Sequence, residues 1–209
     1  GPVIAPSAIM DGLPWDWNSY GEYLDSINAL NPALNIVGLV GHSSVRYEAM
    51  GDKSMDEGVQ PDDAELDYMV KMVRESMEAG AVGFSTSRFL LHKVPDGRCT
   101  PGTWADLRET KAIQEAVIAG GGIGSMFQSA NDMATRFETE LEMFRDGMNL
   151  GCQVLFSGGT GPQGDGGVGR RGGGVEGRRV QRVLDGVVLK HPADVYDLSG
   201  VGHRLARVG

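Results

Sequence analysis

The stretch NIVGLVGHSSVR, residues 35–46, joins an apolar run to side chains that can bind ligands or transfer protons. The run ends at Val40 and is followed by His42, Ser43, Ser44 and Arg46. This order is typical of a buried strand that delivers polar residues to one edge of a sheet. The group is interpreted either as a substrate-anchoring corner or as a strand-end cap whose hydroxyls bond to nearby backbone.

A second polar group follows the next apolar segment of the chain. The stretch STSRFLLHKVPDGR, residues 85–98, carries Arg88 and His92 directly after the residues AVGF. Gln128 lies near the end of a third apolar segment, IGSMFQS. A long loop after a strand is more often a binding element than a short one, and the alternative is a solvated surface loop.

Metal and nucleotide sites have spacing signatures that the chain lacks. It contains four histidines and two cysteines, with neither a His-x-His nor a His-Glu-x-x-His motif. We therefore expect no metal or cofactor to be bound by this chain itself. The stretch GTGPQG, residues 159–164, has the Gly-x-Gly-x-x-Gly spacing, but glycines follow it instead of a helix whose N-terminus would bind a pyrophosphate.

Apolar segments alternate with helical patterns along most of the chain. Strands are expected to begin near residues 36, 81, 123 and 152, with helices within 61–80, 103–122 and 132–149. Such β–α–β spacing predicts an α/β fold with a parallel sheet and right-handed crossovers. A barrel segment of about four β/α units and an open doubly wound sheet both fit this pattern. In both, ligands bind at the carboxyl ends of the strands.

The expected helices carry signals at their ends. Asp62 or Asp63 is placed to cap the first amides of the helix within 61–80, and Gly80 is placed to end it in the left-handed conformation. Thr103 is expected to cap the next helix.

The charge of the chain is unevenly distributed. Residues 1–163 have 11 basic and 23 acidic residues, a net charge of −12, whereas residues 164–209 have 8 basic and 5 acidic residues. An acidic body argues against nucleic acid as a partner, and no apolar run reaches the length of a membrane span. Two cysteines without a disulfide pattern are typical of reduced thiols, so we expect a cytoplasmic protein.

The Gly/Arg-rich tail, residues 164–209, lacks helical or strand periodicity. This composition is typical of a GC-rich gene translated out of frame, and the alternative is a flexible basic extension. We expect a domain boundary near residue 163, with the β/α units before it.

Three longer motifs carry a family resemblance. In order along the chain they are DGLPWDWNSYGEYLDSI, GLVGHSSVRYEAMG and MVRESMEAGAVGFSTSRFLLHK. Their order and spacing resemble the N-acyl-D-amino-acid deacylase (D-aminoacylase) branch of the metal-dependent amidohydrolases. AGGGIGSMFQS and GCQVLFSGG resemble the next two strands of that family, so the resemblance extends over roughly residues 9–160.

The resemblance implies a specific fold and reaction. It implies a distorted (β/α)8 barrel of the TIM type with a small β-sandwich, and hydrolysis of the carbon–nitrogen amide bond of an N-acyl D-amino acid. In the family, a zinc-bound water attacks the carbonyl and an aspartate transfers the proton. Zinc lowers the pKa of the bound water to ~7 and polarises the amide oxygen. The implied partner is a small N-acyl amino acid or a related amide.

The chain departs from the family pattern at the metal ligands. The His-x-His pair, the cysteine ligand and the late proton-transferring aspartate have no counterpart here, and Gln128 stands where the family often has a ligating histidine. A neutral amide is a poor zinc ligand beside imidazole. We therefore predict that the chain is inactive by itself, with no catalytic or metal-binding residues. Its predicted substrate-binding residues are His42, Arg46, Arg88, His92 and Gln128.

A second function class competes with the hydrolase fragment. A non-catalytic β/α domain would use the same edge of the sheet to bind a small anion through Arg46 and Arg88. Analysis of the metal content separates the two classes.

Overall fold

The computed structural model describes residues 11–121 and 124–156. Its elements, in chain order, are α2 (Tyr20–Ala29), β1 (Leu39–Gly41), α3 (His42–Met50), the 3-10 helix η1 (Gly51–Met55), α4 (Asp63–Glu78), β2 (Gly83–Ser87), α5 (Leu107–Ala119), β3 (Met126–Ala130), α6 (Phe137–Leu150) and β4 (Gln153–Phe156). The predicted α/β class and the four predicted strands are confirmed. The GTGPQG motif and the Gly/Arg-rich tail lie outside the described residues.

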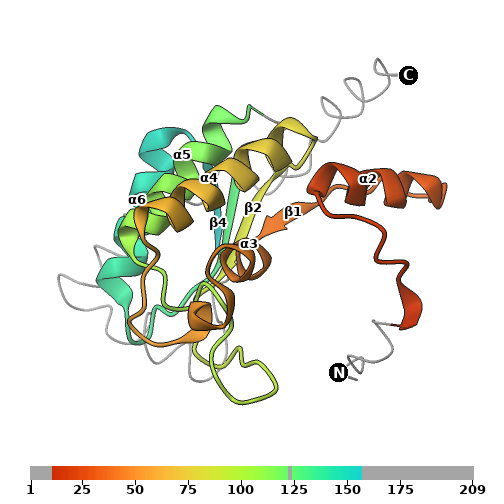
Figure 1. The fold of residues 1–209 in the computed structure, drawn as a ribbon. Coiled ribbons are helices and arrows are strands. Elements are labelled where there is room, and N and C mark those ends of the chain that lie inside the picture. The colour runs from red at the N-terminus through yellow and green to blue at the C-terminus, as the bar shows by residue number, and fades with distance from the viewer. Residues whose placement is uncertain (1–10, 122–123, 157–209) are drawn as a thin grey trace, which may run out of the picture.

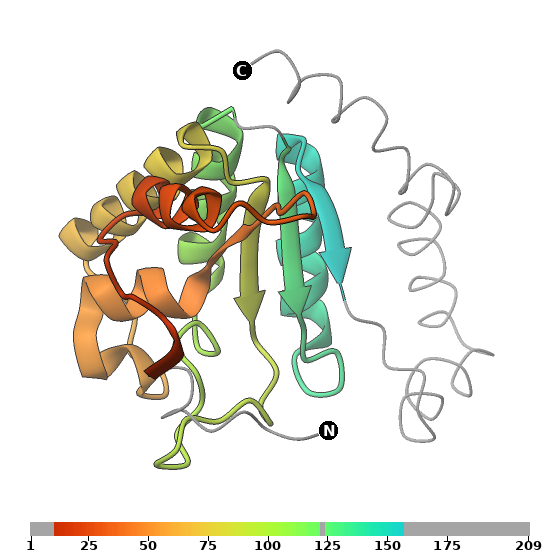
Figure 2. The ribbon, with the colours of Figure 1, turned by 90° about the vertical axis from the view of Figure 1, so that its right-hand side faces the viewer.

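The four strands form one parallel sheet in the order β1-β2-β3-β4. Helices α4, α5 and α6 pack side by side against one face of it, and Figure 2 shows the strands in front of α5 and α6. Figure 1 shows the same layers from the side. A doubly wound sheet reverses its strand order and carries helices on both faces. The described residues have neither feature, so they do not show the doubly wound arrangement.

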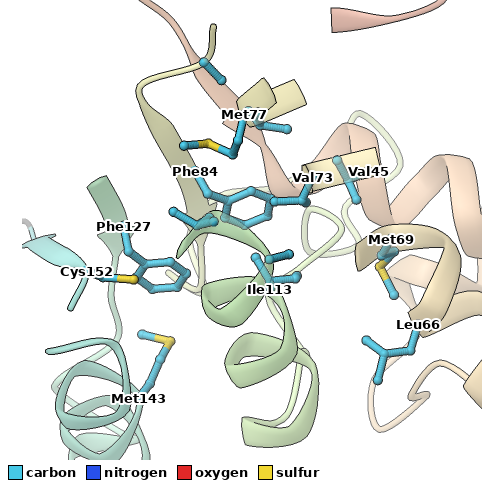
Figure 3. Packing of buried hydrophobic residues seen from close by; sticks show 14 of the residues in the cluster. Val45, Leu66, Met69, Val73, Met77, Phe84, Ile113, Phe127, Met143 and Cys152 are labelled. Carbon is cyan, nitrogen blue, oxygen red and sulfur yellow. The ribbon is translucent and has the colours of Figure 1, made fainter. Parts of the chain in front are cut away.

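The core lies between the sheet and the helices. Val40, Phe84, Phe127 and Val154 are neighbours across the four strands in the register of the sheet. They belong to one core with buried side chains of the helices, among them Val117 and Phe144. Figure 3 shows Val73, Met77, Ile113 and Met143 of the same core. Because side chains alternate along a strand, the residues between these positions lie on the opposite face of the sheet.

The opposite face is not covered by a helix of the described chain. Its central row consists of Gly41, Ser85, Gln128 and Leu155, which are neighbours in register. Ser85 and Gln128 are half-buried, and Leu155 is 51% exposed. In a closed barrel this face would be the interior, where side chains at the carboxyl ends of the strands meet the ligand.

The ends of α4 follow the sequence signals. The Asp62 side chain accepts a hydrogen bond from the Glu65 amide, and the Glu65 side chain accepts one from the Asp62 amide, which completes a capping box. Gly80 has a φ of 119°, and the amides of Gly80 and Ala81 bond to the carbonyls of Met77 and Ser76. Asp62 and Gly80 are thus confirmed in the roles predicted for them.

The predicted cap at Thr103 is wrong. The helix α5 begins at Leu107, and its N-cap is Asp106, whose side chain accepts from the Glu109 amide. Thr103 is fully buried and its hydroxyl donates to the carbonyl of Ser87 instead. The Thr103 side chain therefore ties the loop to the end of β2.

The helix α3 was not expected from the sequence. It starts at His42, directly after β1, without a side-chain cap, and it presents Val45 and Met50 to the core. Its sequence, HSSVRYEAM, lacks a strong apolar stripe, because two of its four buried residues are His42 and Arg46. Burial of these two polar residues hides the helical period from a pattern analysis.

Within residues 11–121 and 124–156, no helix is long and apolar enough to cross a membrane.

Candidate functional site

The carboxyl ends of β1, β2 and β3 bring most of the predicted residues to one edge of the sheet. His42 is the first residue of α3 after β1, Arg88 directly follows β2, and Gln128 lies within β3. The parallel arrangement makes these ends adjacent, as expected. The side chains nevertheless point to two different faces of the sheet.

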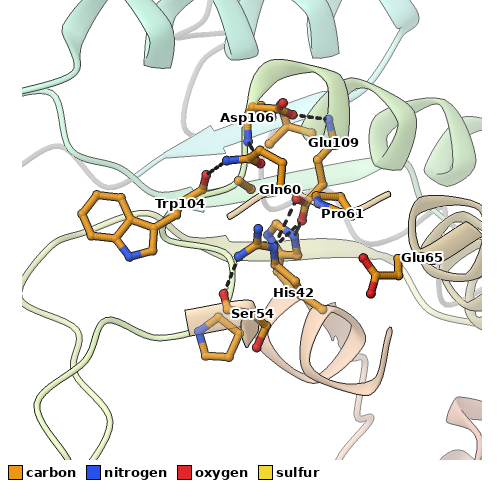
Figure 4. Close-up of polar contacts among 12 residues, drawn as sticks. His42, Ser54, Gln60, Pro61, Glu65, Trp104, Asp106 and Glu109 are labelled. Carbon is orange, nitrogen blue, oxygen red and sulfur yellow. Dashed lines mark hydrogen bonds and ion pairs between the residues drawn. The ribbon is translucent and has the colours of Figure 1, made fainter. Parts of the chain in front are cut away.

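His42 lies in a buried polar cluster between the sheet and α5 (Figure 4). Its Nε2 atom is 2.6 Å from Oε1 of Glu109, and its Nδ1 atom is 2.7 Å from the hydroxyl of Thr86. His42 is 1% exposed and Glu109 is fully buried. Since a carboxylate only accepts, Nε2 carries the proton, and in the neutral ring Nδ1 accepts from the Thr86 hydroxyl.

Arg46 belongs to the same cluster and is fully buried. Its Nε atom donates to Glu109 over 3.1 Å, its Nη2 atom donates to the carbonyl of Val59 over 2.7 Å, and its Nη1 atom donates to the carbonyl of Ser54. The guanidinium thus binds α5 and the segment after α3 to one another. All three nitrogen atoms of the guanidinium therefore donate to protein acceptors.

The charge of Glu109 is stabilised by its two partners. Burial acts to raise the pKa of this carboxyl, but the hydrogen bond from His42 and the positive charge of Arg46 outweigh burial and hold the pKa below its ordinary value. Glu109 is therefore an ionised carboxylate at neutral pH. The cluster is thus a buried ion pair between Glu109 and Arg46, with His42 hydrogen-bonded to the same carboxylate.

Replacement of Thr86 by valine is expected to lower the free energy of unfolding by about 1–3 kcal/mol, because it leaves Nδ1 of His42 buried without a partner. Urea denaturation of the wild-type and variant chains measures the difference. Thr86→Ser keeps the hydroxyl and loses one methyl group, so about 1 kcal/mol is expected. A Thr86→Val variant as stable as the wild type would show that the hydrogen bond contributes nothing.

Arg88 forms a second buried pair. Its Nε atom donates to Oε1 of Glu140 on α6 over 2.7 Å, and its Nη1 atom donates to the carbonyl of Ala105. Arg88 is 2% exposed and Glu140 is fully buried. Oε2 of Glu140 has no hydrogen-bond partner among the described residues. The Arg88 side chain thus points to the helix layer and away from the open face of the sheet.

Gln128 and His92 are the two predicted residues that remain accessible. Gln128 is half-buried on the open face, beside Ser85. His92 is exposed in the loop after β2, and its Nδ1 atom is hydrogen-bonded to the hydroxyl of Ser87. Ser87 shares the open face with Ser85 because both alternate with buried Phe84 and Thr86 along β2, and Gln128 is the neighbour of Ser85 in register. Amide, hydroxyl and imidazole groups there offer hydrogen bonds to a ligand.

Glu109, Glu140 and Thr86 were missed in the sequence. Glu109 shares the buried stripe of α5 with Ile113 and Val117, and Glu140 shares that of α6 with Phe144 and Gly147. An acidic residue on the apolar stripe of a helix is rarely buried without a partner. An acidic residue on an apolar helical stripe was therefore the sequence signal from which the buried pairs of Glu109 and Glu140 could have been predicted.

A surface cavity of about 520 Å³, widely open to solvent, lies beside the first turn of α3. Its lining joins α3 and η1 to the loop after β2 and consists of Ser43, Ser44, Tyr47, Met55, Val94, Pro95, Asp96 and Pro101. A volume of this size is in the usual range for a small-molecule site.

The described residues do not fit a zinc site. No group of three or more histidine, cysteine, aspartate or glutamate side chains converges among them. Both nitrogens of His42 are bonded within the buried cluster, and Cys99 and Cys152 are buried, with burial raising the pKa of Cys152 to about 11. A protonated thiol is a poor ligand.

Comparison with known proteins identifies relatives of this chain, although no protein-family profile matches it. An N-acyl-D-glutamate deacylase of Alcaligenes xylosoxydans xylosoxydans is 29% identical over 157 residues, 75% of this chain and 29% of that enzyme. A D-aminoacylase of the same organism is 28% identical over 156 residues, 73% of this chain and 29% of its own length. An uncharacterised protein of Mycobacterium tuberculosis is 35% identical over 123 residues, 56% of this chain and 20% of its own.

Solved structures show the same relationship in the fold. A crystal structure of D-aminoacylase, described as defining a subset of amidohydrolases, has a TM-score of 0.61 at 22% identity and covers 89% of this chain. The N-acyl-D-glutamate deacylase of Bordetella bronchiseptica, solved with zinc and a phosphonate inhibitor, has a TM-score of 0.57 at 24% identity and covers 80% of this chain. The chain is similar to the D-aminoacylases in sequence and in fold.

This D-aminoacylase-like chain spans only part of the proteins that it resembles. It covers 20–29% of the curated relatives and 35% and 32% of the two solved chains. These matches support the predicted resemblance to the D-aminoacylases.

Proposed function

We propose that the chain is part of a (β/α)8 hydrolase that cleaves a carbon–nitrogen amide bond in N-acyl amino acids. The observation that carries this proposal is the sequence match with N-acyl-D-glutamate deacylase over 75% of the chain. The singly wound sheet and its uncovered face support the barrel assignment. In this proposal the four β/α units form part of a barrel wall, and the catalytic metal ligands lie outside the described residues.

The described residues divide into two roles in this proposal. Gln128 and His92 face the substrate from the carboxyl-end edge, where they are accessible. His42, Arg46 and Arg88 have buried protein partners and act by positioning the ends of β1 and β2. This assignment replaces the direct substrate contact that the sequence predicts for the last three. The anion-binding alternative requires Arg46 and Arg88, and both are already paired with buried glutamates. No observation favours that alternative.

Binding of N-acetyl-D-glutamate to the purified 209-residue chain tests the proposal. Calorimetric titration is expected to show binding of the N-acetylated compound, with free D-glutamate at least about tenfold weaker, because the site is built for the amide. The variant Gln128→Leu is expected to weaken binding about tenfold through loss of its hydrogen bonds.

Gln153→Leu is the matched control for Gln128→Leu. Gln153 lies at the start of β4, on the same face of the sheet as Gln128 but toward its other end. Binding is expected to be unchanged in this variant. Equal binding of N-acetyl-D-glutamate and free D-glutamate, or equal loss in the two variants, would contradict the proposed site.

A further inference from the structure

The loop between β2 and α5, residues 88–106, is held at its base independently of its tip. Arg136 of the following segment donates to the carbonyls of Thr103 and Arg88, and Arg88 donates to the carbonyl of Ala105. The hydroxyl of Ser43 donates to the carbonyl of Pro101 over 2.9 Å. These contacts fix both ends of the loop against α3 and α6.

The tip of the loop depends on Arg98. Its Nη1 and Nη2 atoms each donate over 2.9 Å to a different carboxylate oxygen of Asp52 in η1, which forms a bidentate pair. Its Nε atom donates to Asp96 within the tip over 2.9 Å, and Asp56 is 3.5 Å away. Arg98 thus connects the tip, which is a short turn closed by the bridge between Lys93 and Cys99, to the 3-10 helix.

The cavity beside α3 lies between the two parts that Arg98 joins. Val94, Pro95 and Asp96 line it from the loop tip, and Met55 and Tyr47 line it from η1 and α3. Its lining is mostly apolar, and Asp96 is its one carboxylate. The bond with Arg98 holds the pKa of Asp96 below its ordinary value, so this carboxylate is ionised. The mostly apolar lining therefore favours an uncharged apolar group as the occupant.

We propose that Arg98 is a positioning residue that ties the loop tip to η1 and so shapes this cavity for the acyl chain of an N-acyl amino acid. The inference rests on the proposed function and adds the acyl group to it. In this inference a long acyl chain occupies the cavity, whereas a two-carbon acetyl group is too small to fill its volume of about 520 Å³. Arg98 therefore contributes to affinity only for the long chain.

Comparison of N-octanoyl-D-glutamate with N-acetyl-D-glutamate tests this inference on the full chain. The wild type is expected to bind the octanoyl compound more tightly, and Arg98→Ala is expected to weaken it about fivefold while acetyl binding changes less than about twofold. Arg74→Ala is the matched control. It removes an exposed ion pair between Arg74 and Glu78 on α4, and neither residue lines the cavity. It is expected to change neither affinity.

Hydrogen exchange supplies a readout that does not depend on the ligand. The amide of Val94, which bonds to the carbonyl of Arg98, is expected to exchange faster in Arg98→Ala, and the wild type is expected to approach the variant in 1 M salt. Amides of the core strands are expected to be unchanged.

The outcomes separate the two proposals. Binding of both compounds with equal affinity, or an equal loss of both in Arg98→Ala, would overturn the acyl-chain inference and leave the proposed function intact. Tip amides that exchange alike in the wild type and Arg98→Ala would overturn the positioning role. Failure of both compounds to bind would overturn the proposed function and the inference with it.

Discussion

Replacement of Glu109 by alanine is expected to lower the free energy of unfolding by about 3–5 kcal/mol. The carboxylate is fully buried and accepts from both His42 and Arg46. Without it, the Arg46 guanidinium remains buried with its charge uncompensated. Because whole domains are stable by only about 5–15 kcal/mol, this loss takes a large share of the total.

Urea denaturation followed by circular dichroism measures the loss, and Glu115→Ala is the matched control. Glu115 is an exposed glutamate on the same helix, and its replacement is expected to change stability by less than about 0.5 kcal/mol. A Glu109→Ala variant as stable as Glu115→Ala would show that the buried cluster does not hold the fold together.

The pH dependence of the same cluster has a defined sign. The pKa of Glu109 is lowered in the folded chain, against an ordinary value of 4.5. A group with a lowered pKa stabilises the fold above its ordinary pKa, and this contribution is lost as the pH falls through the folded pKa. The wild type is therefore expected to lose stability below about pH 4.5, and Glu109→Gln is expected to lose less over the same range. Parallel pH profiles for the two proteins would contradict the assignment.

Removal of Arg88 is expected to have an effect of similar size. Arg88→Met leaves the Glu140 carboxylate buried with neither oxygen paired, which costs about 3–5 kcal/mol. The double variant Arg88→Met, Glu140→Leu removes both charges and fills their volume with apolar groups. It is expected to be more stable than either single variant by about 2 kcal/mol, since an apolar replacement of a buried pair is often tolerated.

Arg145→Met, at an exposed position of α6, is the control for this comparison. It removes the same side chain from the same region without a buried partner, and its stability is expected to stay within about 0.5 kcal/mol of the wild type. Chemical denaturation of the wild type, Arg88→Met, Glu140→Leu and the double variant gives the coupling energy between Arg88 and Glu140. A coupling energy near zero would show that the two residues do not depend on one another.

The strands and the long helices were predictable because their signals are local. The apolar stripe of α4, its Asp62 cap and its Gly80 end all lie within about 20 residues of one another, and each acts through the nearest backbone. The parallel sheet followed from the spacing of the strands. The helix α3 was missed because its inward face carries His42 and Arg46, whose burial depends on a partner 63 or more residues further along the chain.

The sequence by itself determined the α/β class, the four strands, both ends of α4 and the resemblance to the D-aminoacylases. Only the tertiary structure decided which polar side chains face a ligand. His42, Arg46 and Arg88 are directed into the helix layer, because Glu109 and Glu140 on α5 and α6 provide the negative charge that makes their burial favourable. Gln128 has no such partner and lies on the open face, since alternation along β3 places its neighbours Phe127 and Ser129 on the helix side.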